Sequence, residues 1–477
     1  MPKPLTYIFL FISLLAGCKT AAPVTLPATT AVPAVYNAEA TDTSSLARQP
    51  WRRFFADTNL VRLVDAALQG NPDLLVAMQR VEVARATLQV ARGALLPSVD
   101  AVASAGVERY GKYTQNGVGN ADTNLSPNVE GNRVVPNPTP DYFLGLRSNW
   151  EVDIWGKLRS RRRAAVARLL ATEQGRRAVQ TSLVAEVARL YYELLTLDSQ
   201  LEVLGKNREL QEQALEIIKL QKLGGRATEL AVQQFTAQLL RTQSRELEVS
   251  QEITARENTL NRLLGRYPQP IRRGAPIRKQ AVPPAISAGL PSTLLLRRPD
   301  IRQAELELQA TRADVAAARA AFLPSLTLTP YVGLNSFRAA TLFDPGSLAL
   351  GVLGGLSAPI FNRNVLKANY TRATARQRAA YLEYQKAIQI SFEEVATGLA
   401  GFANYQRVYD LQEQEVAALT RAVAIADKLY TANYATYLEV ITAQRSALEA
   451  ELNLSTTRRT QFMQLIDLYR ATGGGWE

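Results

Sequence analysis

One pattern occurs twice in this chain, and it constrains the fold more than any other feature. Pro72-Asp73 begins a stretch of helical character that ends at Leu96-Pro97-Ser98, and Pro299-Asp300 begins a similar stretch that ends, at identical spacing, at Leu323-Pro324-Ser325. The residues that recur between these anchors include Ala77 and Ala304, Arg85 and Arg312, and Arg92 and Arg319. Because this unit is far longer than the repeat of a solenoid, we expect two large halves built on one plan.

Alternating apolar and polar residues follow each of the two prolines, and a period of two predicts strands. Four such segments occur in two pairs, at residues 98–108, 142–154, 326–335 and 348–360. A loop rich in Asn, Gly and Pro, from Tyr113 to Pro140, separates the first pair. The pattern therefore predicts two β-hairpins, of which the first has a long tip.

Each predicted strand reaches the roughly 9 to 11 residues that a membrane crossing needs. An open four-stranded sheet in lipid would leave the backbone groups of its edges without partners, and single-chain barrels begin at about 8 strands. We therefore expect several chains to share one barrel. The alternative is a soluble four-stranded domain with one solvated face.

Two long stretches without proline carry apolar residues at steps of three and four, which indicates coiled-coil helices. They run from about Leu158 to Leu223, where the seam includes Leu183, Val187, Leu190 and Leu194, and from Asn364 to Asn433. Shorter helices are predicted for residues 229–264 and 438–470. At 1.5 Å per residue, each long helix would measure on the order of 100 Å. We expect each half of the chain to form a long helical hairpin.

The N-terminus carries a secretory pattern: Lys3 precedes an apolar run, residues 5–15, that is too short to span a bilayer. Leu15-Ala16-Gly17-Cys18 is similar to the lipobox of bacterial lipoproteins. This resemblance implies cleavage before Cys18 and its acylation, and Lys19 in place of an Asp implies the outer membrane. The alternative is an ordinary signal peptide with a chance cysteine.

The composition argues against several classes of function. The chain has no His and one Cys, which removes the commonest metal ligand and general base. The net charge of +12 comes from Arg scattered among Glu and Gln, which is typical of solvated helix faces, so no nucleic acid partner is expected. No Gly-rich phosphate loop or nucleophile motif occurs. We expect no catalytic residues, no cofactor and no metal site.

Three stretches resemble the outer membrane factor family of TolC-like channels, in its lipoprotein branch that serves resistance-nodulation-division efflux systems. They are residues 290–301 (LPSTLLLRRPDI), 318–325 and 468–476 (LYRATGGGW). The resemblance implies a mainly α fold with a transmembrane β part: a homotrimer in which each chain gives four strands to a twelve-stranded β-barrel and two helical hairpins to a periplasmic α-barrel. It also implies a passive exit duct that receives small molecules from a periplasmic membrane-fusion adaptor and an inner membrane pump.

The resemblance further implies a periplasmic gate in the second half of the chain. Glu439 matches an acidic constriction, Thr442 stands where some relatives have a second acid, and Tyr430 matches an aromatic residue of the gate. An exposed helix carboxylate is the alternative interpretation of Glu439. Residues expected at the adaptor-docking tips are Gly224, Gly225, Ala227, Thr228, Asn433, Ala435 and Thr436.

These expectations divide the chain into five parts. They are a signal peptide (1–17), an acylated tether (18–50), a first repeat (51–265, with its β-hairpin at 97–155 and its tip near 224–229), a linker (266–299) and a second repeat (300–477, with its β-hairpin at 324–361 and its tip near 433–437). Two alternative functions stay open: an outer membrane channel for type I protein secretion, and a non-conducting, lipid-anchored periplasmic scaffold.

Overall fold

The computed structural model describes residues 24–27, 33, 49–282, 291, 297–359, 361 and 363–476. Cys18, most of the tether, part of the linker and Ile360 lie outside these residues. The chain is mostly helical with one four-stranded sheet, and it divides into two compact units. One unit holds residues 83–169 and 306–381 with residues up to 27, and the other holds 28–82, 170–305 and 382–477. Each unit thus contains parts of both sequence repeats.

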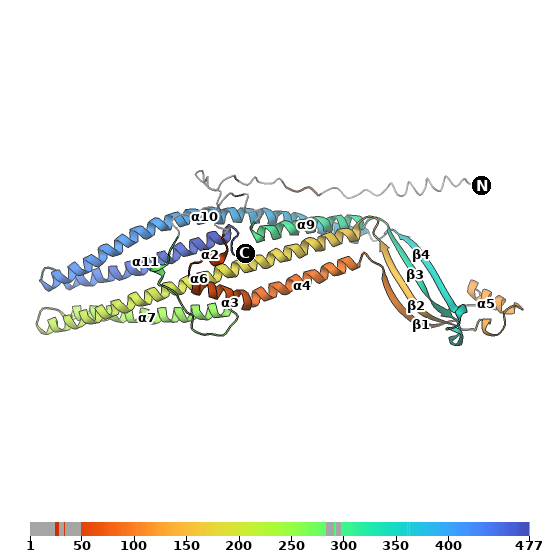
Figure 1. Ribbon diagram of the computed structural model, residues 1–477, viewed down its shortest axis with the longest axis horizontal. Coiled ribbons are helices and arrows are strands. Elements are labelled where there is room, and N and C mark those ends of the chain that lie inside the picture. The colour runs from red at the N-terminus through yellow and green to blue at the C-terminus, as the bar shows by residue number, and fades with distance from the viewer. Residues whose placement is uncertain are drawn as a thin grey trace. The chain divides into compact units, whose positions relative to one another are not determined.

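The sheet of the first unit is antiparallel, in the order β1-β2-β3-β4 (Figure 1). Its strands are β1 (Ser98–Glu108), β2 (Thr139–Val152), β3 (Ser325–Ser336) and β4 (Leu348–Ser357). The two predicted hairpins are confirmed, and β2 also pairs with β3, so the two repeats form one sheet. Strands β1 and β4 are its edges.

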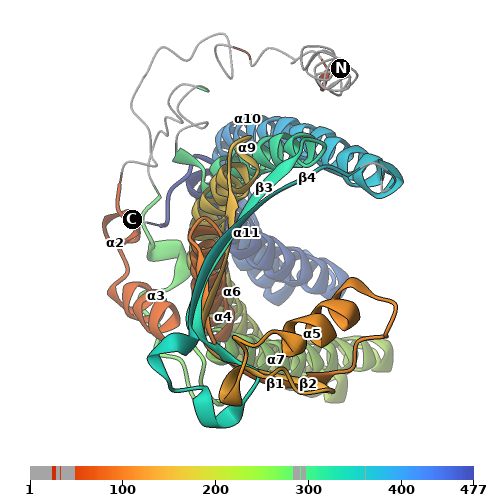
Figure 2. The ribbon, with the colours of Figure 1, turned by 90° about the vertical axis from the view of Figure 1, so that its right-hand side faces the viewer.

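The predicted loop between the first two strands was wrong in one respect, because it contains a helix, α5 (Gln115–Leu125), on the β1–β2 side of the sheet (Figure 2). The Thr114 hydroxyl caps this helix by accepting from the Gly117 amide at 3.1 Å. The Asn124 side chain holds the returning chain through both backbone groups of Val135. The sequence of α5 is rich in Asn and Gly, with weak helix propensity and no apolar period, so the sequence pattern did not indicate a helix.

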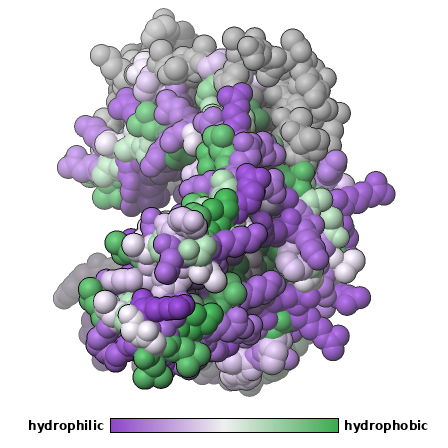
Figure 3. Space-filling view, turned by 90° about the vertical axis from the view of Figure 1, so that its left-hand side faces the viewer, coloured by the Kyte–Doolittle hydropathy of each residue, from purple (hydrophilic) through white to green (hydrophobic). Residues whose placement is uncertain are grey.

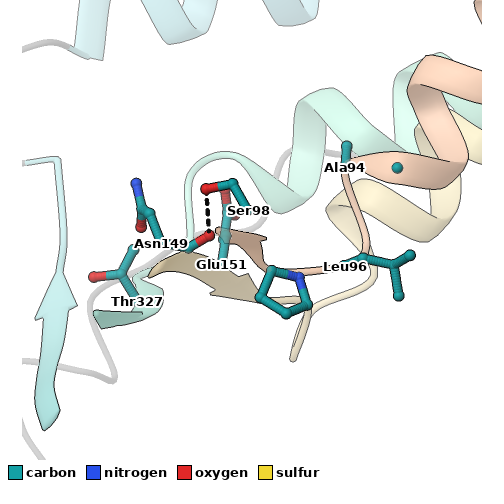
Figure 4. Close-up of a pocket in the computed structure, with 8 residues that line it drawn as sticks. Ala94, Leu96, Ser98, Asn149, Glu151 and Thr327 are labelled. Atoms are coloured by element: carbon teal, nitrogen blue, oxygen red, sulfur yellow. Dashed lines mark hydrogen bonds between the residues drawn. The ribbon is translucent and has the colours of Figure 1, made fainter. Parts of the chain in front are cut away.

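Two tryptophan side chains hold the chain where helix changes to strand. The helices α4 (Pro72–Gly93) and α9 (Pro299–Ala320) end earlier than predicted, since a residue before proline disfavours the helical conformation. The Trp150 indole N–H donates to the Leu95 carbonyl at 3.0 Å, and that of Trp155 donates to the Pro324 carbonyl at 2.7 Å. An open pocket lies beside the first of these changes from helix to strand, where the Ser98 hydroxyl donates to the Asn149 carbonyl (Figure 4).

The helical hairpins follow the predicted coiled-coil pattern. Their helices are α6 (Lys157–Leu223), α7 (Glu229–Leu263), α10 (Arg363–Thr431) and α11 (Tyr437–Ala471). The predicted seam residues Leu183, Val187, Leu190 and Leu194 are buried, which confirms the seam. The second helix of each hairpin, α7 or α11, has 35 residues. Among the described residues, no helix is at once long and apolar enough to cross a lipid bilayer.

The main core of the second unit joins segments that are far apart in sequence. Helix α2 (Trp51–Phe54), helix α3 (Thr58–Gly70) and linker residues Ile271 and Ile277 pack against α6, α7 and α11. A buried hydrogen-bond chain ties them together: the Tyr191 hydroxyl donates to Asp57 at 2.6 Å and accepts from the Gly274 amide at 2.8 Å. Burial raises the pKa of Tyr191, so it stays a neutral donor.

A buried arginine clamps the start of α9 to the middle of α10 and to the end of α11. Arg298 is 5% exposed and binds Asp300, Glu394 and the Ala471 carbonyl, at 2.6, 2.6 and 3.0 Å. Arg470 contacts the other oxygen of Glu394 at 2.8 Å. Burial raises the pKa of Asp300, but hydrogen bonds and the charge of Arg298 outweigh it, so the net shift is downward.

We predict that Arg298→Met lowers the free energy of unfolding by about 2 kcal/mol, because it leaves partly buried acceptors without their donor. Arg302→Met is the matched control, since the Arg302–Glu305 pair lies nearer the surface and should contribute less than about 1 kcal/mol. Thermal loss of the helical circular dichroism signal measures both. Equal effects of the two substitutions would contradict the clamp.

The ion pair between Arg298 and Asp300 predicts that the stability of the fold depends on pH. The pKa of the Asp300 carboxyl is lower in the folded protein than its unfolded value of 3.8. The stabilisation that its carboxylate contributes is therefore fully present above the unfolded pKa and is lost as the pH falls through the folded pKa. We expect acidification to destabilise Arg298→Met less than the unsubstituted protein.

Candidate functional site

The predicted tips of the two helical hairpins lie in the second unit, and both tips have the same type of turn. Gly225 follows α6 with a φ of 70°, and Asn433 follows α10 with a φ of 65°. In the first tip, the Arg226 amide donates to the Gln221 carbonyl at 2.8 Å, and in the second the Tyr434 amide donates to the Leu429 carbonyl at 2.8 Å. This is the Schellman arrangement, in which a left-handed residue ends the helix. Asn433 takes the place of glycine because a short polar side chain tolerates this conformation.

The helix that follows each turn begins with a threonine cap, but only the second cap is complete. Thr228 accepts from the Ala231 amide at 3.2 Å and begins α7. Thr436 begins α11 in a full capping box, in which the Glu439 carboxylate accepts from the Thr436 amide and from its hydroxyl. Glu439 is exposed, so its carboxylate both supports the local helix start and faces solvent in the single protomer.

The two tips differ in the contact that closes each turn. In the first tip the Lys222 ammonium binds the Glu229 carboxylate. The corresponding positions of the second tip hold Tyr430 and Tyr437, both partly buried. The Tyr430 hydroxyl instead donates to the side chain of Gln221, which belongs to the first tip. This bond joins the two hairpins of one chain.

Gln221 is a partner of the predicted gate residue Tyr430 that the sequence did not indicate. The two residues are separated by 209 positions, and no local pattern links them. Behind them, Phe235, Val232 and Val440 form a small apolar core that contacts the side chains of both tips. Thr442 is exposed and lies on α11 one turn beyond Glu439.

The tip residues expected to dock a partner lie in the two turns or at the helix starts. Gly224, Gly225, Thr228, Asn433 and Thr436 are exposed, whereas Ala227 and Ala435 are partly covered. Large apolar side chains beside them are also exposed: Leu223, Leu230, Tyr434 and Leu438, at 85%, 61%, 84% and 55%. Figure 3 views the chain from the side of these turns and shows apolar side chains among polar ones.

The sheet of the first unit has two chemically different faces. On one face, cross-strand rows of apolar residues span all four strands, for example Ala101, Leu146, Val332 and Leu350. Leu146 is 47% exposed and Leu350 is 73% exposed. The opposite face carries the charged residues of the strands, which are Asp100, Glu108, Asp141, Arg147 and Glu151. An apolar face that is exposed across the whole sheet calls for a non-aqueous environment or a partner.

Within the described part of the chain, no group of three or more acidic, Cys or His side chains is placed to hold a metal ion.

The comparisons with known proteins agree on one family. The family model for the outer membrane efflux protein matches residues 63–266 and 290–474. The solvent efflux pump outer membrane protein SrpC of Pseudomonas putida is 33% identical over 89% of this chain and 87% of its own length. The probable outer membrane lipoprotein SilC of Salmonella typhimurium is 30% identical over 98% of this chain and 97% of its own.

A solved structure has the same fold over nearly the whole chain. It is the open state of the MtrE outer membrane channel of Neisseria gonorrhoeae, with a TM-score of 0.82, 27% identity, and coverage of 96% of this chain and 99% of that one. These findings confirm the resemblance and the fold class inferred from the sequence. The chain belongs to the outer membrane efflux protein family, whose members are channels, and it acts as an outer membrane efflux channel.

Proposed function

We propose that three copies of this chain form one exit duct, which conducts small molecules passively from a periplasmic adaptor and an inner membrane resistance-nodulation-division pump to the exterior. The observation that carries this proposal is the sheet, which has an apolar face, a polar face and two edges that pair with no strand of the described residues. Three such sheets joined edge to edge would close a twelve-stranded barrel and pair every strand. The apolar face would contact lipid and the polar face would line the duct.

The helical hairpins are proposed to continue the duct into the periplasm, with the gate at their tips. Glu439 of each chain would face its copies near the axis, where grouped carboxylates attract cations. Thr442, which cannot be charged, lies beside it and leaves one carboxylate per chain in this ring. The hydrogen bond between Tyr430 and Gln221 would hold the two hairpins of each chain together in the closed state.

The exposed turns are proposed to receive the adaptor. The residues proposed to contact the adaptor are Gly224, Gly225, Ala227, Thr228, Asn433, Ala435 and Thr436. The exposed leucines beside them support the proposal, because an exposed apolar patch with a polar rim is typical of a protein interface.

Cys18 is proposed as the acylated N-terminus of the mature chain, held in the periplasmic leaflet of the outer membrane. The relative SilC is itself described as a probable outer membrane lipoprotein, which supports this assignment. No covalent chemistry is proposed for the channel, and no nucleic acid or cofactor takes part.

The proposed assembly predicts heat-modifiable trimers that conduct ions in planar bilayers. Purified protein should migrate as a trimer before heating and as a monomer afterwards, and it should open discrete channels. A soluble, non-conducting species would favour the lipid-anchored scaffold. Restoration of protein secretion, but not drug resistance, in a channel-deficient strain would favour type I secretion.

We predict that Glu439→Gln reduces the cation preference of the channel, measured as the reversal potential in a salt gradient. Gln at this position keeps the capping box with Thr436, so the substitution removes the charge and leaves the helix start intact. The matched control is Glu229→Gln in the first tip, where Lys222 already balances the carboxylate. An unchanged reversal potential for Glu439→Gln would disprove the acidic ring.

Cross-linking tests the docking tips. We predict that Ala227→Cys and Ala435→Cys, labelled with a short photoreactive reagent, capture the adaptor in cells that contain the complete pump. Ala237→Cys is the control, because Ala237 is exposed on α7 but lies two turns from the tip. Capture from Ala237 alone would place the adaptor elsewhere.

A further inference from the structure

The first turns of both long helices carry positive charge that no acidic residue of the same segment balances. Between Ile154 and Thr172, at the start of α6, the chain has six Lys and Arg residues and no Asp or Glu. Helix α10 begins in the same way, with five such residues and no acid from Arg363 to Leu382. Both helices begin at the same end of the sheet. Cations at the start of a helix oppose the helix dipole, so helix stability does not explain them.

Half of the six cations of α6 are left without a neutralising partner. The three that are balanced by carboxylates are Lys157 with Glu151, Arg159 with Asp153, and Arg168 with Asp314. The other three, Arg161, Arg162 and Arg163, are exposed, and none of them forms an ion pair with a described residue. Arg163 makes one neutral contact, because its guanidinium donates to the Ser160 hydroxyl at 2.9 Å.

These three arginines lie on two different sides of α6. Glu151 belongs to the polar face of the sheet, so its partner Lys157 marks the side of the helix that continues this face. Arg161 follows Lys157 by four residues and lies on the same side. Arg162 and Arg163 lie about 140° and about 240° around the helix from Lys157. This pair therefore lies on the side that continues the apolar face.

Exposed apolar side chains stand between the apolar face and the arginine pair. Ile154 and Trp155, which follow the last residues of β2, are 48% and 52% exposed. The Trp155 indole donates to the Pro324 carbonyl, and this bond holds the ring at the end of the sheet. In the second repeat Phe361, 97% exposed, precedes the exposed Lys367 in the same order. An aromatic residue followed by cations is typical of the boundary between a membrane and water.

We propose that Arg162 and Arg163 bind the phosphate of an anionic phospholipid in the periplasmic leaflet of the outer membrane. The inference rests on the proposed function, in which the apolar face of the sheet contacts lipid. Guanidinium groups match phosphate oxygens with paired hydrogen bonds, and two of them are adjacent here. The acyl chains of the same lipid lie along the apolar face beyond Ile154. The site fixes the depth of each chain in the membrane.

Native mass spectrometry of the purified trimer tests this site. Trimers in detergent are titrated with phosphatidylglycerol or phosphatidylethanolamine of the same acyl chains, and the bound lipids are counted. We expect the anionic lipid to bind more tightly, because the other head group has no net charge. Arg162→Gln should weaken its binding about fivefold, and Arg162→Gln with Arg163→Gln more than about tenfold, since each arginine near a membrane surface contributes a factor of about five. The same spectra show whether each variant still forms trimers.

Arg161→Gln is the matched control. It removes the same charge from the adjacent position, but on the side of α6 that continues the polar face, so phosphatidylglycerol should bind as it does to the unsubstituted protein. Excess inorganic phosphate should leave the lipid bound, because burial of the acyl chains supplies part of the affinity.

The outcomes separate the two proposals. If the unsubstituted protein forms no conducting trimers, the proposed function fails. If conducting trimers bind both lipids equally, or if Arg161→Gln weakens phosphatidylglycerol binding as much as Arg162→Gln does, the lipid site is disproved while the channel assignment stands. Displacement of the lipid by inorganic phosphate would assign the arginine pair to a soluble anion and would equally disprove the lipid site.

Discussion

Unpaired backbone groups at the edges of the sheet are the constraint on which the rest of the structure depends. Within the described part of the chain, strands β1 and β4 each pair on one side only, and a lipid environment supplies no hydrogen bonds to the other side. The chain alone therefore cannot satisfy its own backbone in a membrane. Closure by further copies answers this need, and it explains why the apolar face of a small sheet can stay exposed in one protomer.

The change from helix to strand is fixed in the same way in both repeats. Each β-hairpin begins at a Leu-Pro-Ser sequence, where the chain changes from helix to strand. At both places the indole of a tryptophan from the first repeat, Trp150 or Trp155, donates to a backbone carbonyl. Trp155 thus links the first repeat to the second at the point where α9 gives way to β3. At the other end of its helix, α9 is held by Arg298 against Glu394 and the α11 terminus. A polar contact therefore fixes the chain next to each end of α9, a buried one at Arg298 and an exposed one at Trp155.

Much of this fold could be predicted from the sequence because it rests on periodic patterns. The strands alternate over their full length, and the long helices repeat every three or four residues, so Leu190 and Leu194 were correctly expected in a seam. Helix α5 was missed because its Asn and Gly residues carry no such pattern, and its cap, Thr114, acts through geometry alone.

The candidate site was harder to predict, since its contacts join distant parts of the chain. The duplication located the turns at Gly225 and Asn433, where a left-handed residue is needed at the same place. It could not indicate that Tyr430 would bind Gln221, because this pair exists only after the two repeats have folded together.

The equal lengths of two pairs of duplicated helices have a consequence for how such a chain can change. Helices α4 and α9 have 22 residues each, and α7 and α11 have 35 each, whereas the β1–β2 connection has gained α5 and the β3–β4 connection is short. One inserted residue would rotate the rest of a helix by roughly 100° and turn its buried seam outward. Added sequence is thus expected in the strand connections rather than inside these helices. The strand connections are therefore free to diverge, while the strands and helices that they join keep their register.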